Sequence, residues 1–192
     1  MQKVNKRKAS VSQMLLFVVI IMLLFQVYIY AMDKHLIITQ GKIVKDSLTM
    51  SNLATLKNID LNTLGSDLKT TVILDTVSYQ KDFKQKLLVN MGLSQSMTVS
   101  NHPVLTGSVV IDEMIIYNVY DGVDYVEIKK VDPNTGACLS TTQGSRVGTQ
   151  KTPSGETVRK TSSYVNLKFK INLSIWGSQE CSVSDTVEIS QN

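Results

Sequence analysis

Hydrophobic residues are concentrated in one uninterrupted run near the start of the chain. Residues 14–32 (MLLFVVIIMLLFQVYIYAM) carry no charge, and twelve of these nineteen residues are Leu, Ile, Val or Phe. As a helix the run is about 28 Å long, close to the roughly 30 Å hydrocarbon core of a bilayer. The pattern therefore predicts a single transmembrane helix over residues 14–32.

Two other structures share part of this pattern. A cleaved secretory signal also follows basic residues, but its apolar region is usually ~7 to 15 residues long and ends in small residues. In this run Ala31 is the one small residue near the end. A buried helix of a soluble domain is the second alternative. The length and ending of the run favour an uncleaved anchor over both.

Basic residues in front of the run predict its orientation. Residues 1–13 carry Lys3, Lys6, Arg7 and Lys8 and no acid. Directly after the apolar run, the charges of Asp33, Lys34 and His35 nearly cancel. Because basic residues are retained on the cytoplasmic side, residues 1–13 are expected to form a cytoplasmic leader. The chain is then a single-pass protein of the cell membrane, with the lipid bilayer as a partner and residues 33–192 outside.

Beyond the run, the apolar spacing predicts two further helical segments. Residues 33–64 carry apolar residues at intervals nearer three or four than two, which predicts an amphipathic continuation that ends within residues 58–65. This stripe comprises Leu36, Ile43, Val44, Leu48, Leu53 and Leu56. A second helix is expected over residues 78–93, capped by Ser78 and closed by Gly92, with an Asp82–Lys86 pair. Its apolar face comprises Tyr79, Phe83, Leu87 and Leu88.

Alternation with a period of two then predicts strands. Residues 108–120 and 123–131 flank Asp121-Gly122, a dipeptide that favours a type I′ hairpin turn. Residues 70–74, 164–175 and 183–189 also indicate strands, whereas residues 139–161, rich in Ser, Thr and Gly, indicate a long surface loop. One face of the first hairpin strand is expected to comprise Val109, Ile111, Ile115, Tyr117 and Val119, interrupted by Glu113. Together these elements predict an α+β fold with a β-rich antiparallel head over residues 65–192.

Charge and cysteine content narrow the classes of function. The net charge of +4 arises from 20 basic and 16 acidic residues, and the leader alone holds four of the basic ones. The remaining chain is neutral, which argues against nucleic acid as a partner. Cys138 and Cys181 are a candidate disulfide if the head lies in an oxidising compartment, and two free thiols are the alternative.

The chemistry of the side chains indicates no enzyme. No phosphate-binding glycine loop, HExxH pair, GxSxG elbow or EF-hand pattern is present in the sequence. His102 is the best candidate base, yet it adjoins Pro103 in an expected loop, and the adjacent Asp112 and Glu113 would lie on opposite faces of a strand. We therefore expect no catalytic, cofactor-binding or metal site.

The order of these segments resembles one family. The basic leader, the apolar helix and its SNLATL continuation are followed by YQKDFKQKLLVNMGL, the YNVYDG hairpin and the TSSYVNLKFKI strand. This succession is similar to TadE-like minor pilins or pseudopilins of Gram-positive tight-adherence (Tad) pilus loci, which are related to type IV pilins. The resemblance implies a leader cut before the helix, and Ala9-Ser10 is the matching small-residue site. Such a cut makes Met14 the fifth residue, where type IV pilins often carry Glu.

The resemblance implies a non-enzymatic, membrane-anchored structural subunit of a Tad or type IV-like pilus or secretion apparatus. Its helix would pack against other pilin-like subunits or assembly proteins, and Gln26 is a candidate interhelical hydrogen-bonding residue within the apolar run. The alternative is a single-pass exported binding or sensing module that never enters a filament, with residues 139–161 as its ligand-binding loop.

Overall fold

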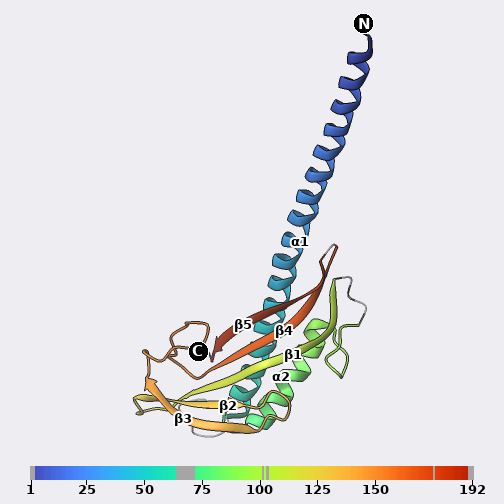
Figure 1. The fold of residues 1–192 in the computed structure, drawn as a ribbon. Coiled ribbons are helices and arrows are strands. Elements are labelled where there is room, and N and C mark those ends of the chain that lie inside the picture. Colours follow the sequence, from blue (N-terminus) through green and yellow to red (C-terminus); the bar gives the residue numbers. More distant parts are fainter. Residues whose placement is uncertain (1–2, 64–71, 101, 103, 175, 190–192) are drawn as a thin grey trace.

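The computed structural model describes residues 3–63, 72–100, 102, 104–174 and 176–189, with side chains of the first range described from residue 11 to residue 57. A long helix projects from a head that contains a second helix and an antiparallel sheet (Figure 1). The predicted α+β class is confirmed for this part of the chain. The elements are α1 (Lys3–Thr63), α2 (Thr76–Met91), β1 (Leu105–Val119), β2 (Tyr125–Val131), β3 (Cys138–Arg146), β4 (Ser162–Leu173) and β5 (Gly177–Glu188).

Helix α1 runs without interruption from the basic leader into the head. Its 61 residues correspond to about 92 Å of helix. The segment contains no proline, and its one glycine, Gly41, costs only about 1 kcal/mol relative to alanine. The predicted continuation of the apolar helix is therefore confirmed, and the end at Thr63 lies within the predicted range.

Burial along α1 begins abruptly at Asp33 and then follows one face of the helix. The buried residues that recur along this face are Asp33, Gln40, Val44, Leu48, Ser51, Asn52, Thr55 and Leu56. The prediction of a single apolar stripe is wrong in two places, because Ile43 is 47% exposed and Leu53 is 44% exposed. Each residue advances by about 100° around a helix, so Ile43 cannot face the same way as its buried neighbour Val44.

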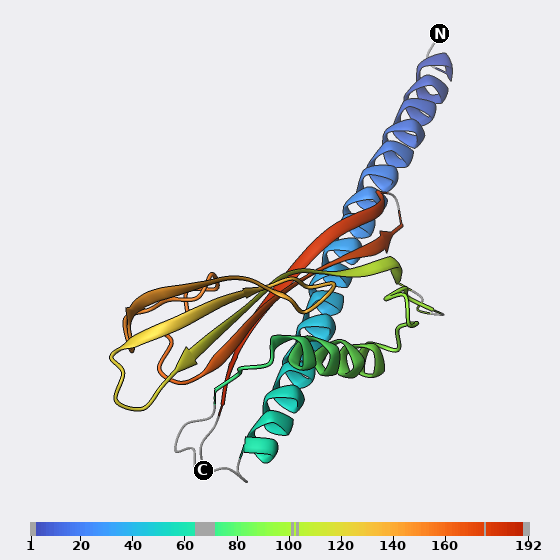
Figure 2. The ribbon, with the colours of Figure 1, turned by 90° about the horizontal axis from the view of Figure 1, so that it is seen from below.

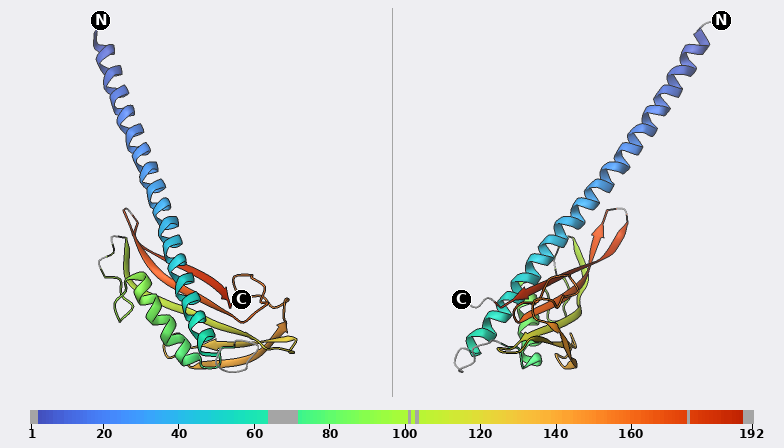
Figure 3. Two further views of the ribbon diagram at one scale, coloured as in Figure 1. Left: turned by 180° about the vertical axis from the view of Figure 1, so that it is seen from behind. Right: turned by 90° about the vertical axis from the view of Figure 1, so that its left-hand side faces the viewer.

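The five strands form one antiparallel sheet in the order β3-β2-β1-β4-β5. Helix α1 packs against β4, β5 and α2, and both helices lie on the same face of the sheet (Figures 2 and 3). The main core fills the space between the helices and this face. Its largest fully buried side chains include Phe83 and Leu87 of α2, Met114 of β1, and Phe169 and Ile171 of β4.

The N-terminal cap of helix α2 lies three residues before the predicted one. Asp75, not Ser78, caps the helix, because its carboxylate accepts from the backbone N–H groups of Val77 and Ser78 at 3.1 and 3.0 Å. The Ser78 hydroxyl donates to the same carboxylate at 2.6 Å. The predicted closure at Gly92 is confirmed, since this glycine adopts a φ of 62° and its N–H bonds back to the helix. The predicted apolar face and the Asp82–Lys86 pair, at 2.6 Å, are also confirmed.

A bulge in β1 divides the predicted apolar face between two sides of the sheet. Ile111 pairs with Leu167 but Glu113 pairs with Asn166, so β1 has one extra residue between them. An extra residue reverses the alternation of side chains beyond it. The main core therefore contains Val109 and Ile111 before the bulge and Met114 and Ile116 after it, whereas Ile115 and Tyr117 point to the other side.

The predicted surface loop over residues 139–161 is partly wrong. Strand β3 occupies its first third and pairs with β2, with Thr142 opposite Ile128. Val158, only 1% exposed, joins Tyr117 and Val126 in a second cluster on the far face of the sheet. The sequence did not indicate β3, because almost all of this edge strand is exposed and it therefore needs no apolar alternation.

Two smaller predictions about backbone conformation are also wrong. Of the segment expected as a strand over residues 70–74, the described part from residue 72 is not a strand. The Asp121-Gly122 turn is not type I′, which needs a positive φ at both residues, because only Gly122 has one (73°). The last hairpin pair is Val119 opposite Val126, so the connection is longer than two residues.

The alternating strand predicted over residues 164–175 is confirmed as β4 up to Leu173, and its apolar residues are buried as expected. Ile175 lies outside the described residues. The last strand begins at Gly177 instead of residue 183, because the polar stretch GSQECS pairs along β4 as an edge strand.

The predicted disulfide is not formed. Cys138 lies on β3 and Cys181 on β5, and both are free. These strands are the opposite edges of the sheet, four strand spacings or about 19 Å apart. A disulfide needs Cα atoms within about 7 Å, so this fold excludes a bridge within one chain.

The turn between β2 and β3 generates a test of the fold. A Cβ atom on Gly136 would lie 2.8 Å from the Cα of Val77 in α2, and the residue has a φ of 75°. Gly148 has a φ of 82° but open space around it, so Gly148→Ala isolates the conformational cost of about 1 to 2 kcal/mol. We expect Gly136→Ala to lower the free energy of unfolding by at least about 1 kcal/mol more, measured by urea denaturation in detergent. Equal losses would show that α2 does not contact this turn.

Candidate functional site

The most unusual surface of the molecule is the apolar segment of α1, defined here as residues 11–32. Almost all of its large side chains are exposed, for example Met14 at 74%, Leu24 at 63% and Tyr30 at 59%. Figure 1 shows this part of the helix projecting beyond the described head. Among the described residues, one helix is long and apolar enough to cross a membrane, and it contains this segment. Contiguous exposed apolar surface of this size is rare in water and indicates a membrane or protein partner.

Three residues singled out from the sequence lie on the projecting half of α1, two at the predicted processing site and one within the apolar segment. Ala9 and Ser10 lie within the helical backbone just before the apolar segment, and their side chains are outside the described part. Gln26 is exposed among apolar neighbours. The structure thus places all three on the projecting helix, away from the head.

The apolar segment ends where the head begins. Asp33 follows Met32 directly and is only 4% exposed. Its Oδ1 atom accepts from the backbone N–H of Ser174, just after β4, at 3.1 Å. Its Oδ2 atom has no partner among the described residues. The contact therefore marks the level along α1 at which the sheet first meets the helix.

A polar clamp of Asn52, Tyr79 and Ser163 joins the two helices to the sheet. The Nδ2 group of Asn52 donates to the Ser163 carbonyl at 3.0 Å, and the Tyr79 hydroxyl lies 2.6 Å from both Asn52 Oδ1 and Ser163 Oγ. A phenol has one proton, and the amide oxygen can only accept, so Tyr79 donates to Asn52 and accepts from Ser163. Because all three groups are buried, each depends on the others for its hydrogen bonds.

Burial also controls the protonation of the clamp. Desolvation raises the pKa of Tyr79 well above its ordinary value of 10.0, the hydrogen bond from Ser163 opposes this increase, and the charge of Asp82 adds to it. The phenol is therefore neutral at physiological pH and keeps its proton for Asn52.

Further side chains attach the second half of α1 to its neighbours. The Thr49 hydroxyl donates to Asp185 of β5 at 2.6 Å, and Asn90 of α2 donates to Ser51 at 2.8 Å. With the clamp, these contacts hold α1 on two sides. The apolar segment is consequently a continuous helical extension of a part of α1 that the head holds in place.

The exposed side of α1 carries a second apolar stripe, which we call the outer stripe. It consists of Ile43, Met50 and Leu53, exposed by 47%, 64% and 44%. Their spacing of seven and three residues places them on one face of the helix. The prediction from sequence merged this stripe with the buried one, and the separation became visible only with the packed head.

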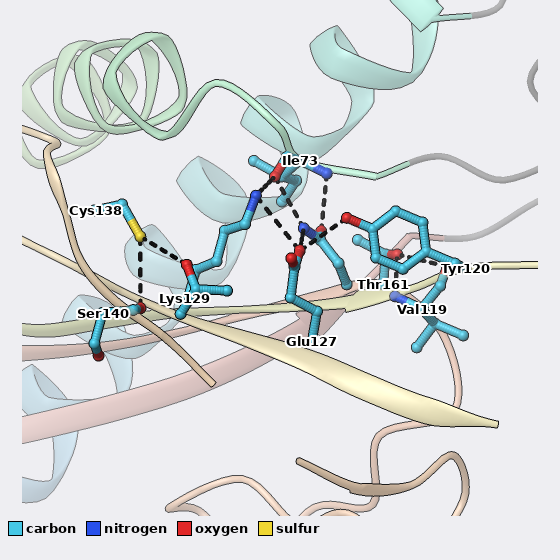
Figure 4. A network of polar contacts seen from close by, with 10 residues as sticks. Ile73, Val119, Tyr120, Glu127, Lys129, Cys138, Ser140 and Thr161 are labelled. Carbon is cyan, nitrogen blue, oxygen red and sulfur yellow. Dashed lines mark hydrogen bonds and ion pairs between the residues drawn. The ribbon is translucent and has the colours of Figure 1, made fainter. Parts of the chain in front are cut away.

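A second polar cluster holds the segment before α2 against the sheet (Figure 4). Asn118 of β1 is fully buried, and its amide accepts from the Ile73 N–H and donates to the Ile73 carbonyl at 2.9 and 3.0 Å. The same amide donates to Glu127 at 2.9 Å, and Lys129 lies 3.4 Å from that carboxylate. Asn118 thus provides the backbone pairing that a strand would otherwise provide for Ile73.

The charge state of this cluster follows from its hydrogen bonds. Burial raises the pKa of Glu127. Hydrogen bonds from Asn118 and Tyr120 and the charge of Lys129 together lower it by more, so the net pKa lies below the ordinary 4.5. Burial and the bond to Glu127 raise the pKa of Tyr120 to about 12. Glu127 is therefore ionised at neutral pH and Tyr120 is the donor between them.

The candidate catalytic groups of the sequence have other contacts. The Nδ1 atom of His102 accepts from the backbone N–H groups of Val104 and Leu105 at 3.2 and 2.9 Å. These two bonds give this nitrogen a structural role. Asp112 pairs with Lys168 at 2.7 Å. Within the described ranges, no three His, Cys, Asp or Glu residues are grouped as metal ligands.

No family model, curated protein or solved structure matches this chain. The exposed apolar segment of α1 and its attachment to the head are therefore the features that indicate function.

The polar clamp generates a test of how α1 is held. Tyr79→Phe leaves the buried Asn52 Oδ1 without its donor, so the free energy of unfolding should fall by about 1 to 3 kcal/mol. Tyr125→Phe, at a strand residue that is 41% exposed, is the matched control and should change it little. Urea denaturation of both variants in detergent measures the difference. Similar stabilities would show that the clamp does not hold the helix.

The Glu127 cluster generates a test by pH. A carboxylate whose pKa is lower in the folded state stabilises that state above its unfolded pKa, and the contribution is lost as pH falls through the folded value. Glu127→Gln should therefore lower the free energy of unfolding at neutral pH, and the difference from the wild type should narrow as the pH falls below the ordinary carboxyl pKa of 4.5. Glu180→Gln, on exposed β5, is the control. A gap that stays constant with pH would contradict an ionised Glu127.

Proposed function

We propose that this protein is a membrane-anchored, non-enzymatic, pilin-like structural subunit, similar to TadE-like minor pilins or pseudopilins of a Tad or type IV-like apparatus. The observation that carries this proposal is the uninterrupted α1, which is apolar and largely exposed over residues 11–32 and packs one face against the head from Asp33. The apolar segment spans about 33 Å, enough for the hydrocarbon core of a bilayer. The basic leader supports an orientation with the N-terminus in the cytoplasm and the head outside.

The rigid attachment of the span to the head favours a structural role. A module that only tethers a binding domain to a membrane needs no fixed geometry, and a flexible linker suffices for it. Here the clamp and Thr49 join α1 to the sheet, Ser51 joins it to α2, and the helix continues into the span without a break. A subunit that transmits force or position between neighbours requires such a connection.

The outer stripe supports association through α1. Ile43, Met50 and Leu53 are not used by the head, and they extend the apolar surface of α1 beyond the membrane. Within the bilayer, helices associate through close packing and interhelical hydrogen bonds, for which Gln26 is suited. We therefore propose that α1 packs against helices of other pilin-like subunits or assembly proteins, after removal of residues 1–9 by a cut between Ala9 and Ser10.

Photo-crosslinking in the native membrane tests this proposal. A photoreactive side chain at Met50, on the outer stripe, should give adducts with another membrane-anchored chain, because the stripe is expected to face a neighbouring helix. The same side chain at Val89 of α2, which is 77% exposed, is the control and should give few adducts. Mass spectrometry of the products identifies the partner and shows whether residues 1–9 are absent.

Membrane-bound protein with no adduct at Met50 would contradict the structural subunit and favour the exported binding or sensing module. Equal adducts at Met50 and Val89 would contradict a specific role of α1. A full-length chain in the adduct would remove the processing step and leave the association in place.

A further inference from the structure

Trp176 is a large aromatic residue that the head does not use. It is the one tryptophan of the sequence and lies in the turn between β4 and β5, where it is 68% exposed. Exposed tryptophan at the end of a hairpin contributes nothing to the core of the head. The level of this turn relative to α1 indicates what Trp176 contacts.

The β4–β5 turn is held at the level where the apolar segment ends. Ser174, two residues before Trp176, donates its N–H to Asp33, and Asp33 follows the last residue of the apolar segment. In Figures 1 and 3 this turn is the part of the sheet that reaches furthest towards the N-terminal end of α1. The hairpin therefore points towards the membrane that the proposed anchor spans.

The dimensions put the interface of such a membrane within reach of Trp176. Two extended residues reach about 7 Å from Ser174. The polar layer on each side of the hydrocarbon core is about 5 to 8 Å thick. Tyr28 and Tyr30, exposed by 61% and 59%, lie on α1 within the last turns of the apolar segment. Tryptophan and tyrosine are enriched in this layer because their rings are apolar and their N–H or O–H groups are polar.

We propose that the β4–β5 turn docks on the bilayer and inserts Trp176 into the interfacial layer of the leaflet that faces the head. This inference rests on the anchor in the proposed function and adds a second membrane contact to it. With α1 and the turn both in the membrane, the head lies against the bilayer in one orientation. The outer stripe then faces a fixed direction relative to the bilayer, in which a neighbouring subunit can contact it.

The single tryptophan makes the proposal testable with the wild-type, full-length chain. The protein is reconstituted in phosphatidylcholine vesicles and recovered with them by flotation. Phosphatidylcholine brominated in the acyl chains near the headgroup should quench the Trp176 emission at least about twofold, because the ring lies at the headgroup boundary. Aqueous iodide should quench it weakly. The emission should also be shifted to shorter wavelength than that of a water-exposed indole.

A matched control moves the tryptophan to another exposed site. In the variant Trp176→Phe with Leu139→Trp, the indole lies on β3, at the far edge of the sheet, where Leu139 is 67% exposed. Iodide should quench this indole, and brominated lipid should not. The control shows that quenching by lipid reports the position of the turn and not the presence of the anchor.

Three results would overturn the inference. If wild-type protein floats with the vesicles but only iodide quenches the Trp176 emission, the turn lies in water. The anchor is then retained and the docking is excluded. A blue-shifted emission that neither quencher reaches would indicate that another protein chain covers Trp176. Failure to float would remove the anchor itself, and the docking with it.

Discussion

The continuity of α1 through two environments is the constraint on which the rest of the structure depends. One helix is apolar and largely exposed over residues 11–32, and from Asp33 onwards it packs one face against the head. Because α1 is one continuous helix, the contacts that hold its second half also orient its first half. The polar clamp, the Thr49–Asp185 bond and the Asn90–Ser51 bond therefore determine how the apolar segment leaves the head.

Buried polar groups specify the position of α1 on the sheet more closely than the apolar core does. Apolar contacts of Val44 and Leu48 are nondirectional and would tolerate a shift of the helix along the sheet. A buried amide such as Asn52, which loses its partners on shifting by even one turn, does not tolerate it. Asn118 has the corresponding role for the segment before α2, where its amide pairs with both backbone groups of Ile73. Directional bonds thus select one arrangement among the several that the core alone would allow.

Several elements could be predicted because their signal is local. The apolar run is recognised by its length and lack of charge. The helical continuation, the face of α2 and the alternation of β4 repeat with the period of the structure they form. The predictions failed where tertiary contacts replace the local signal. Strand β3 has no apolar face to alternate, the bulge before Glu113 reverses the faces of β1, and Asn118 takes the place of a neighbouring strand for Ile73. The two apolar stripes of α1 were merged, because spacing alone does not say which face the head covers.

The sequence by itself determined that a long apolar helix precedes an α+β head of neutral charge, since length, charge and periodicity are properties of the chain. Only the tertiary structure decided that the two cysteines lie on opposite edges of the sheet, because strand order depends on which strands pair and not on their spacing along the chain. It also decided that the β4–β5 turn reaches the end of the apolar segment, through the bond between Ser174 and Asp33, which are 141 residues apart. Contacts over such separations depend on the whole packed head.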